Sequence, residues 1–282
     1  MGTSASNNGP KKNSSLLPSW ASSLENTSND DKSQNGNNDK PIDSNDSQTS
    51  DNSNESAITG NWAAAKGALS RYARGTNGSS LRKASQSYVK TLGGSSKATK
   101  SAVKGIATGG IFLNFVSNIS TNGFVKTLEK FGLSDCIGKS SEEVLAKIAD
   151  RIAPIGSTND EAIARDATLE TLDFLYEKLL EEGKELDSLE SLDEQTMKDS
   201  VGEYISTYIY KKWLYEVGLA IEKNELTEKE AVALEKEIKE FVRDETKSAL
   251  REKNILTLNL SEGDGKKIIE NIFELAYSTI SK

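Results

Sequence analysis

Apolar residues recur at helical spacing through most of the chain after residue 60. Positions i, i+3, i+7 and i+10 predict a first helix that Asn61 caps and Gly75 ends, with a buried stripe of Trp62, Ala65, Leu69 and Tyr72. The same spacing predicts a second helix over 80–92. We expect a third, looser helix over 97–118, weakened by Gly105 and the Gly109–Gly110 pair.

From about residue 121 the pattern becomes strongly helical. Ser140 with Glu143 and Thr227 with Glu230 have capping-box spacing, which predicts helices over 141–153 and 228–252. Further helices are expected over 160–182, with a stripe that includes Leu169, and over 264–281. Segment 201–221 is apolar on most sides, which is typical of the central helix of a bundle. The strand-like segment 255–258 is too isolated to build a sheet.

Composition divides the chain into three segments. Residues 1–56 hold 11 Asn and 14 Ser with few large apolar side chains, which predicts a disordered tail. Residues 57–120 predict basic, Gly- and Ala-rich short helices, and 121–282 an acidic helical bundle. Net charge is −4 over 1–56, +10 over 57–128 and −14 over 129–282. The sequence therefore predicts an all-α fold, a helical bundle preceded by a long disordered N-terminal tail.

The composition also excludes several function classes. The chain has no His, which removes His-dependent nucleophile arrangements and imidazole-based zinc motifs. Its single Cys136 cannot form an intramolecular disulfide, and we expect it to be a small buried residue. No apolar run approaches the ~20 residues that span a bilayer. We expect a cytoplasmic protein that is not an enzyme, does not enter a membrane, and has no metal site and no cofactor.

One apolar cluster stands out in the polar tail. Its members are Leu16, Leu17, Pro18 and Trp20. A stiff proline beside a large aromatic has the composition of a docking peptide, because Trp supplies much contact area for few frozen torsions. The alternative is a chance cluster, or one that folds back on its own domain.

The basic segment 57–128 has ten Lys and Arg residues and no acid. Its cations, among them Arg71, Arg74, Arg82 and Lys83, could neutralise phosphates while Tyr72 and Tyr88 stack on bases, forming a nucleic-acid-binding module. Alternatively, the segment packs against the acidic helices of the same chain or against an acidic partner. Both interpretations stay open at the level of sequence.

The N-terminus offers a third kind of site. Initiator Met1 is normally removed before a residue as small as Gly2, which leaves the Gly2 amine at the end of a long tether. Gly2 and Ser6 also satisfy the Met-Gly-x-x-x-Ser pattern of myristoylation, although one acyl chain anchors only marginally. A modified amine, a lipid-anchored scaffold and an ordinary free terminus are the alternatives.

The sequence resembles the QatB family, a component of the bacterial Qat anti-phage defence system. The resemblance is carried by Met1-Gly2-Thr3-Ser4, Leu16 to Trp20, the helix from Trp62 to Gly75, Ser87-Tyr88-Val89, Glu142-Glu143-Val144-Leu145, Tyr208-Ile209-Tyr210 and Trp213-Leu214. It implies a non-catalytic subunit that accompanies an ATPase, a QueC-like enzyme and a TatD-like nuclease.

A QueC-like enzyme activates a deazaguanine carboxylate with ATP and transfers it to ammonia. Because Gly2 is followed by the Leu17-Pro18-Trp20 anchor, we hypothesise that the Gly2 amine takes the place of ammonia in this reaction. The partner-binding residues expected on this hypothesis are Thr3, Ser4, Leu16, Leu17, Pro18 and Trp20.

Overall fold

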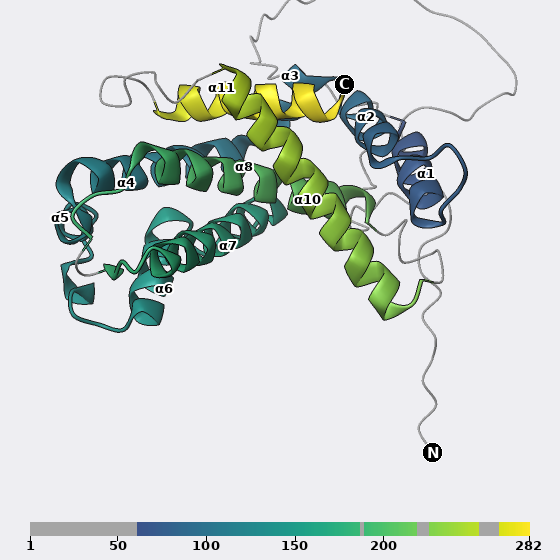
Figure 1. Ribbon diagram of the computed structural model, residues 1–282. Coiled ribbons are helices and arrows are strands. Elements are labelled where there is room, and N and C mark those ends of the chain that lie inside the picture. The colour runs from purple at the N-terminus through teal and green to yellow at the C-terminus, as the bar shows by residue number, and fades with distance from the viewer. Residues whose placement is uncertain (1–60, 187–188, 219–225, 254–264) are drawn as a thin grey trace, which may run out of the picture. The chain divides into compact units, whose positions relative to one another are not determined.

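The computed structural model describes residues 61–186, 189–218, 226–253 and 265–282 (Figure 1). Within these ranges the fold is all-α and contains no strand, as the sequence predicts. The predicted tail 1–56 and the strand-like segment 255–258 lie outside the described residues. In chain order the helices are α1 (Trp62–Ala73), α2 (Leu81–Thr91), α3 (Ser95–Ser101), α4 (Val103–Asn122), α5 (Phe124–Lys130), α6 (Ser141–Ile152), α7 (Asn159–Glu181), α8 (Glu194–Val217), α10 (Glu228–Lys253) and α11 (Gly265–Ile280).

Side-chain caps position the helix ends, at Asn61 and Thr227 as predicted and also at Ser80. Asn61 Oδ1 accepts a hydrogen bond from the Ala64 amide at 3.1 Å, and Ser80 Oγ accepts one from the Lys83 amide at 3.2 Å. Gly75 follows α1 with a φ of +62°, a left-handed conformation that favours glycine. Thr227 and Glu230 exchange the two hydrogen bonds of a capping box at the start of α10.

The predicted third helix over 97–118 is wrong in its extent and its continuity. This part of the chain forms two helices, α3 and α4, because the backbone turns at Ala102, where φ is −92° and ψ is +41°. α4 then runs without a break to Asn122 and crosses the expected 120/121 domain boundary. The described residues on both sides of this boundary belong to one compact unit.

Glycines within α4 serve close packing between helices. A Cβ added at Gly105 would lie 2.5 Å from ring carbons of Tyr208, and one at Gly109 would lie 2.8 Å from the Tyr204 ring. Because both positions lack a side chain, α4 packs directly against the tyrosines of α8. This packing outweighs the low helix propensity that predicts a weakened helix.

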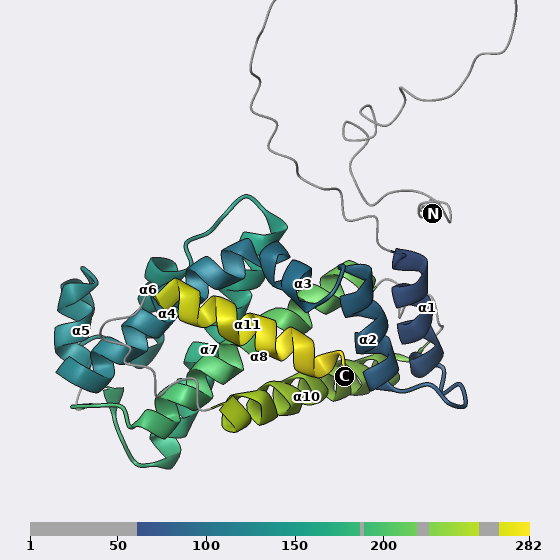
Figure 2. The same ribbon diagram turned by 90° about the horizontal axis from the view of Figure 1, so that it is seen from above.

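α8 lies at the centre of the bundle, as predicted, and packs against α4, α7 and α10 (Figures 1 and 2). Aromatic pairs join it to three other helices: Tyr88 of α2 stacks on Trp213 at 5.6 Å, Phe112 of α4 on Tyr204 at 5.7 Å, and Phe273 of α11 meets Tyr208 edge-on at 5.3 Å. Leu169, expected in the buried stripe of α7, is instead 37% exposed. Its neighbour Thr168 faces the core in its place, while Leu172 of the same predicted stripe is buried.

Candidate interaction surface

The four cations singled out in the basic segment lie where α1 and α2 meet. These two helices pack against each other, and their connecting turn brings the end of α1 next to the start of α2 (Figure 2). Arg71 is in the last turn of α1 and Arg74 is its C-terminal cap residue. Arg82 and Lys83 are in the first turn of α2. All four side chains are exposed.

Arg82 is engaged within the chain. Its guanidinium pairs with Glu245 of α10 and lies 5.8 Å from the centre of the Phe241 ring. Beside it, the Tyr72 hydroxyl of α1 donates to Glu237 of α10 at 2.9 Å. Burial, with the hydrogen bond and the charge of Glu237, raises the pKa of Tyr72 to about 12. These contacts attach α1 and α2 to the acidic helix α10.

Arg71 and Lys83 face a hollow of about 100 Å³ at the α1–α2 turn. Ala68 and Gly78 also line this hollow, together with four polar residues of the turn: Thr76, Asn77, Ser79 and Ser80. Lys83 Nζ donates to the Gly78 carbonyl at 2.5 Å, which holds the ammonium at the rim. The hollow thus combines two cations with hydroxyl and amide groups.

Beyond the hollow, positive charge continues along α2 and α3. Six exposed cations on or directly after α1, α2 and α3 form no ion pair within the described residues. We call them the basic α1–α3 surface: Arg71, Arg74, Lys83, Lys90, Lys97 and Lys100. The other cation of this segment that pairs with an acid is Lys104, which lies 2.7 Å from Glu161 of α7. Among the described residues, two of the ten cations in 57–128 therefore pair with the acidic helices.

The expectation that Tyr88 is free to stack on bases is wrong. Its side chain is fully buried against Trp213, and its hydroxyl donates to Glu216 of α8 at 2.7 Å. Burial raises the pKa of Tyr88 well above its ordinary value, with a further contribution from Glu216. Tyr72 is half-buried and tied to Glu237. The helical stripes that place both tyrosines toward the core are visible in the sequence.

A partly buried polar network fixes the N-terminal helices on the bundle, and sequence reasoning missed it. Asp160 of α7 accepts hydrogen bonds from the Tyr208 hydroxyl and, at 3.0 Å, from the Lys104 amide. Lys212 Nζ lies 3.2 Å from Glu216, which also accepts from Tyr88. The only sequence signal is the i,i+4 spacing of Lys212 and Glu216, which also occurs on ordinary solvated helix faces.

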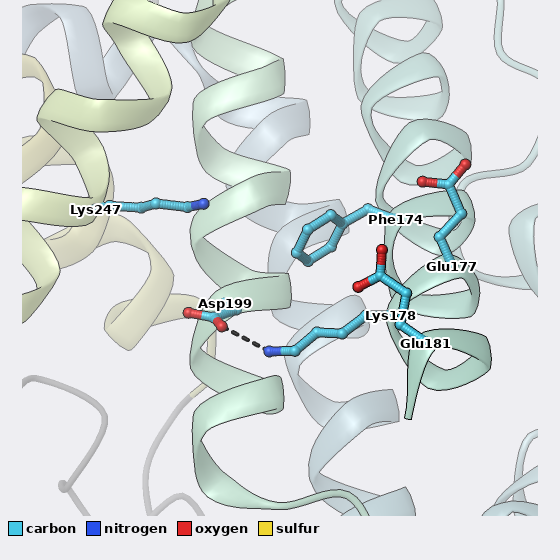
Figure 3. A pocket seen from close by; sticks show the side chains of 6 residues that line it. All are labelled: Phe174, Glu177, Lys178, Glu181, Asp199 and Lys247. Carbon is cyan, nitrogen blue, oxygen red and sulfur yellow. Dashed lines mark hydrogen bonds and ion pairs between the residues drawn. The ribbon is translucent and has the colours of Figure 1, made fainter. Parts of the chain in front are cut away.

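A second pocket, of about 290 Å³, lies between α7, α8 and α10 (Figure 3). Lys178 of α7 forms an ion pair with Asp199 of α8 at 2.7 Å, and Lys247 extends from α10 toward them. Phe174, Glu177 and Glu181 complete the lining. Charges of both signs meet here, so the pocket does not select an anion or a cation by its net charge.

Cys136 is fully buried, as predicted. Burial raises the pKa of its thiol, with a smaller contribution from the neighbouring Asp135. In the part of the chain that the structure describes, no three His, Cys, Asp or Glu side chains form a group that could hold a metal ion. No described helix is long and apolar enough to cross a membrane.

The expected modification and partner-binding residues lie outside the described residues. These are Gly2, Thr3, Ser4, Leu16, Leu17, Pro18 and Trp20. Their proposed roles therefore stay predictions from the sequence.

Comparison with known proteins found one family. A family model described as QatB, Qat anti-phage system associated protein, matches residues 93–280, which extend from the end of α2 through α11. No curated protein and no solved structure matched the chain. The match covers the central helix α8 and its neighbours, and it begins after the four cations at the α1–α2 junction.

Proposed function

Because the chain belongs to the QatB family of Qat anti-phage defence proteins, we propose that it is the non-catalytic subunit of a cytoplasmic defence complex. It binds a QueC-like enzyme and presents its Gly2 amine to that enzyme as a substrate. An ATPase and a TatD-like nuclease are the further partners. The observation that carries the proposal is a small residue behind Met1, followed within 20 residues by an isolated Leu-Leu-Pro-Ser-Trp segment.

The chemistry favours the N-terminal amine over the lysines. A QueC-like enzyme would convert a carboxylate and ATP to an acyl adenylate and pyrophosphate. The neutral Gly2 amine then attacks the acyl carbon, AMP leaves with the electron pair of the broken bond, and the nitrogen loses a proton as the amide forms. An α-amine with a pKa near 7.8 is neutral in roughly a tenth of molecules at pH 7, against fewer than one in a thousand for Lys.

Ion pairs within the bundle strengthen this selectivity. The hydrogen bonds that Lys104, Lys139 and Lys184 donate to Glu161, Glu143 and Glu182, respectively, raise the pKa values of these lysines. The raised pKa values lower the fraction of each lysine that is present as the neutral, nucleophilic amine. The buried thiol of Cys136 has a raised pKa and is also a poor nucleophile. These properties favour the N-terminal amine over these three lysines and over Cys136.

The test is the intact mass of the full chain produced together with its QueC-like partner. We expect one adduct on the chain that has lost Met1, and we expect it to be absent from Gly2→Pro, which keeps a small residue for trimming but offers a hindered secondary amine. Gly9→Ala is the matched control and should carry the adduct. An unmodified mature N-terminus in the parent chain, or an adduct that persists in Gly2→Pro, contradicts the proposal.

Docking is tested separately by titration calorimetry with the QueC-like partner. We expect Leu17→Asp combined with Trp20→Ala to weaken binding at least 30-fold, because buried aromatic anchors typically contribute about 2 kcal/mol or more. Ile42→Asp introduces the same kind of charge elsewhere in the segment before α1 and should leave the affinity within 2-fold. Equal losses in both variants would show that no specific anchor exists.

A further inference from the structure

The basic α1–α3 surface has a composition that points to the class of its ligand. Its six cations, Arg71, Arg74, Lys83, Lys90, Lys97 and Lys100, are exposed, and none is paired with an acid of the described residues. No Asp or Glu occurs anywhere in 57–128, so the segment itself supplies nothing to neutralise them. The six cations lie on or directly after three successive short helices, and Arg71 and Lys83 meet at one hollow, where an external polyanion relieves the repulsion between them.

The surface lacks the apolar centre of a protein interface. Among the described residues, the first large hydrophobic side chain in the sequence that is exposed is Val103, which follows α3. Protein interfaces contain a dehydrated apolar core, usually with aromatic residues, whereas nucleic-acid interfaces are polar and strongly positive. The observations therefore favour phosphates over an acidic protein as the ligand.

The hollow at the α1–α2 turn is suited to a phosphate group. Arg71 and Lys83 come to it from different helices, and the hollow, at about 100 Å³, has room for one phosphate. Thr76 and Asn77, which line it, have side-chain donors that no other described residue engages. A guanidinium offers paired N–H donors to phosphate oxygens, and an ammonium adds a point charge.

The structure also decides which mode of nucleic-acid binding is open. Tyr88 is buried and Tyr72 is held by Glu237, so neither tyrosine is available to stack on unpaired bases. Arg82 is engaged with Glu245 and does not belong to the surface. What remains are contacts with the phosphate backbone, which do not depend on base sequence.

We propose that α1, α2 and α3 bind the phosphate backbone of duplex nucleic acid without sequence specificity, with one phosphate seated between Arg71 and Lys83. The acidic remainder of the chain, with a net charge of −14 over 129–282, repels the duplex and confines it to this end of the bundle. This proposal is independent of Gly2 and of the QueC-like partner. Its failure would leave the proposed modification unaffected.

The experiment measures the fluorescence anisotropy of a labelled 20-base-pair DNA duplex titrated with the full chain at 50 to 200 mM NaCl. Six phosphate contacts give a slope of about −5 in a plot of log affinity against log salt, which corresponds to roughly 10³-fold weaker binding over this range. The variant Arg71→Glu/Lys83→Glu/Lys97→Glu changes one cation on each of the three helices. We expect the slope to become shallower by about 3, and the affinity at 50 mM NaCl to decrease more than 10-fold.

The matched control is Lys126→Glu/Lys147→Glu/Lys229→Glu, which changes one exposed cation on each of α5, α6 and α10 and makes the same change in net charge. It should keep the parent slope. If charge reversal unfolds the first variant, Arg71→Gln/Lys83→Gln/Lys97→Gln replaces it, with about half the loss expected. No binding by the parent chain at 50 mM, equal losses in variant and control, or binding of polyglutamate in preference to the duplex would each overturn the proposal.

Discussion

Replacing Gly105 with Ala tests the close approach of α4 to α8. The new Cβ would lie 2.5 Å from two ring carbons of Tyr208 and 2.8 Å from a third. Ordinary carbon contacts are about 3.5–4.0 Å, so one helix must move by roughly 1 Å. Tyr208 cannot yield easily, because its ring packs on Phe273 and its hydroxyl donates to Asp160.

Two opposing effects set the magnitude for Gly105→Ala. Overpacking of a filled core costs about 1–3 kcal/mol and occasionally more. The higher helix propensity of Ala relative to Gly offsets up to about 1 kcal/mol of this cost. We expect a net loss of about 2 kcal/mol in the free energy of unfolding, which lowers Tm by roughly 4–8 °C for a domain of this size.

Gly67→Ala in α1 is the matched control. Its Cβ would meet only a terminal guanidinium nitrogen of the exposed Arg71, at 3.3 Å, and that flexible group can move aside. The same substitution should therefore stabilise the protein by about 0.5–1 kcal/mol. Urea unfolding followed by far-ultraviolet circular dichroism measures both variants. A Gly105→Ala protein as stable as the parent, or equal losses at both positions, would refute this account of the packing.

Three further predictions concern charged and reactive groups. Arg243→Ala should cost about 2–3 kcal/mol in urea unfolding because it leaves the buried Glu203 carboxylate without its partner, and adding Glu203→Met should recover most of the loss. Glu161 has a pKa lowered to about 2, first by the hydrogen bond from Lys104, so its contribution is complete above about pH 4.5 and lost as the pH falls toward 2. The parent chain should accordingly lose more stability between pH 6 and pH 3 than Glu161→Gln, and equal losses would contradict this assignment. Cys136 should react with a thiol reagent such as dithionitrobenzoate only as the protein unfolds, and rapid labelling of the native chain would show that the site is open.

Helix positions were largely predictable from the sequence because their signals are local. Asn61 and Thr227 act as caps at the expected positions, and the apolar periods place α1, α2, α6, α7, α8 and α11 near their observed bounds. A capping hydrogen bond joins residues only three positions apart, so it depends little on the rest of the fold. The break at Ala102 carried no such signal, because neither Gly nor Pro occupies the position.

The sequence by itself determined the all-α class, the segregation of charge and the absence of histidine chemistry. The tertiary structure decided which cations are available. Arg82 and Lys104 are neutralised by Glu245 and Glu161, acids that are distant in the sequence, whereas the basic α1–α3 surface stays unpaired among the described residues. In the folded structure, Gly105 allows α4 to pack closely on α8, although the sequence predicts a weak point of the helix there. Tyr88 is buried. Charge and periodicity belong to the chain, but pairing and close contact depend on distances between residues that only folding brings together.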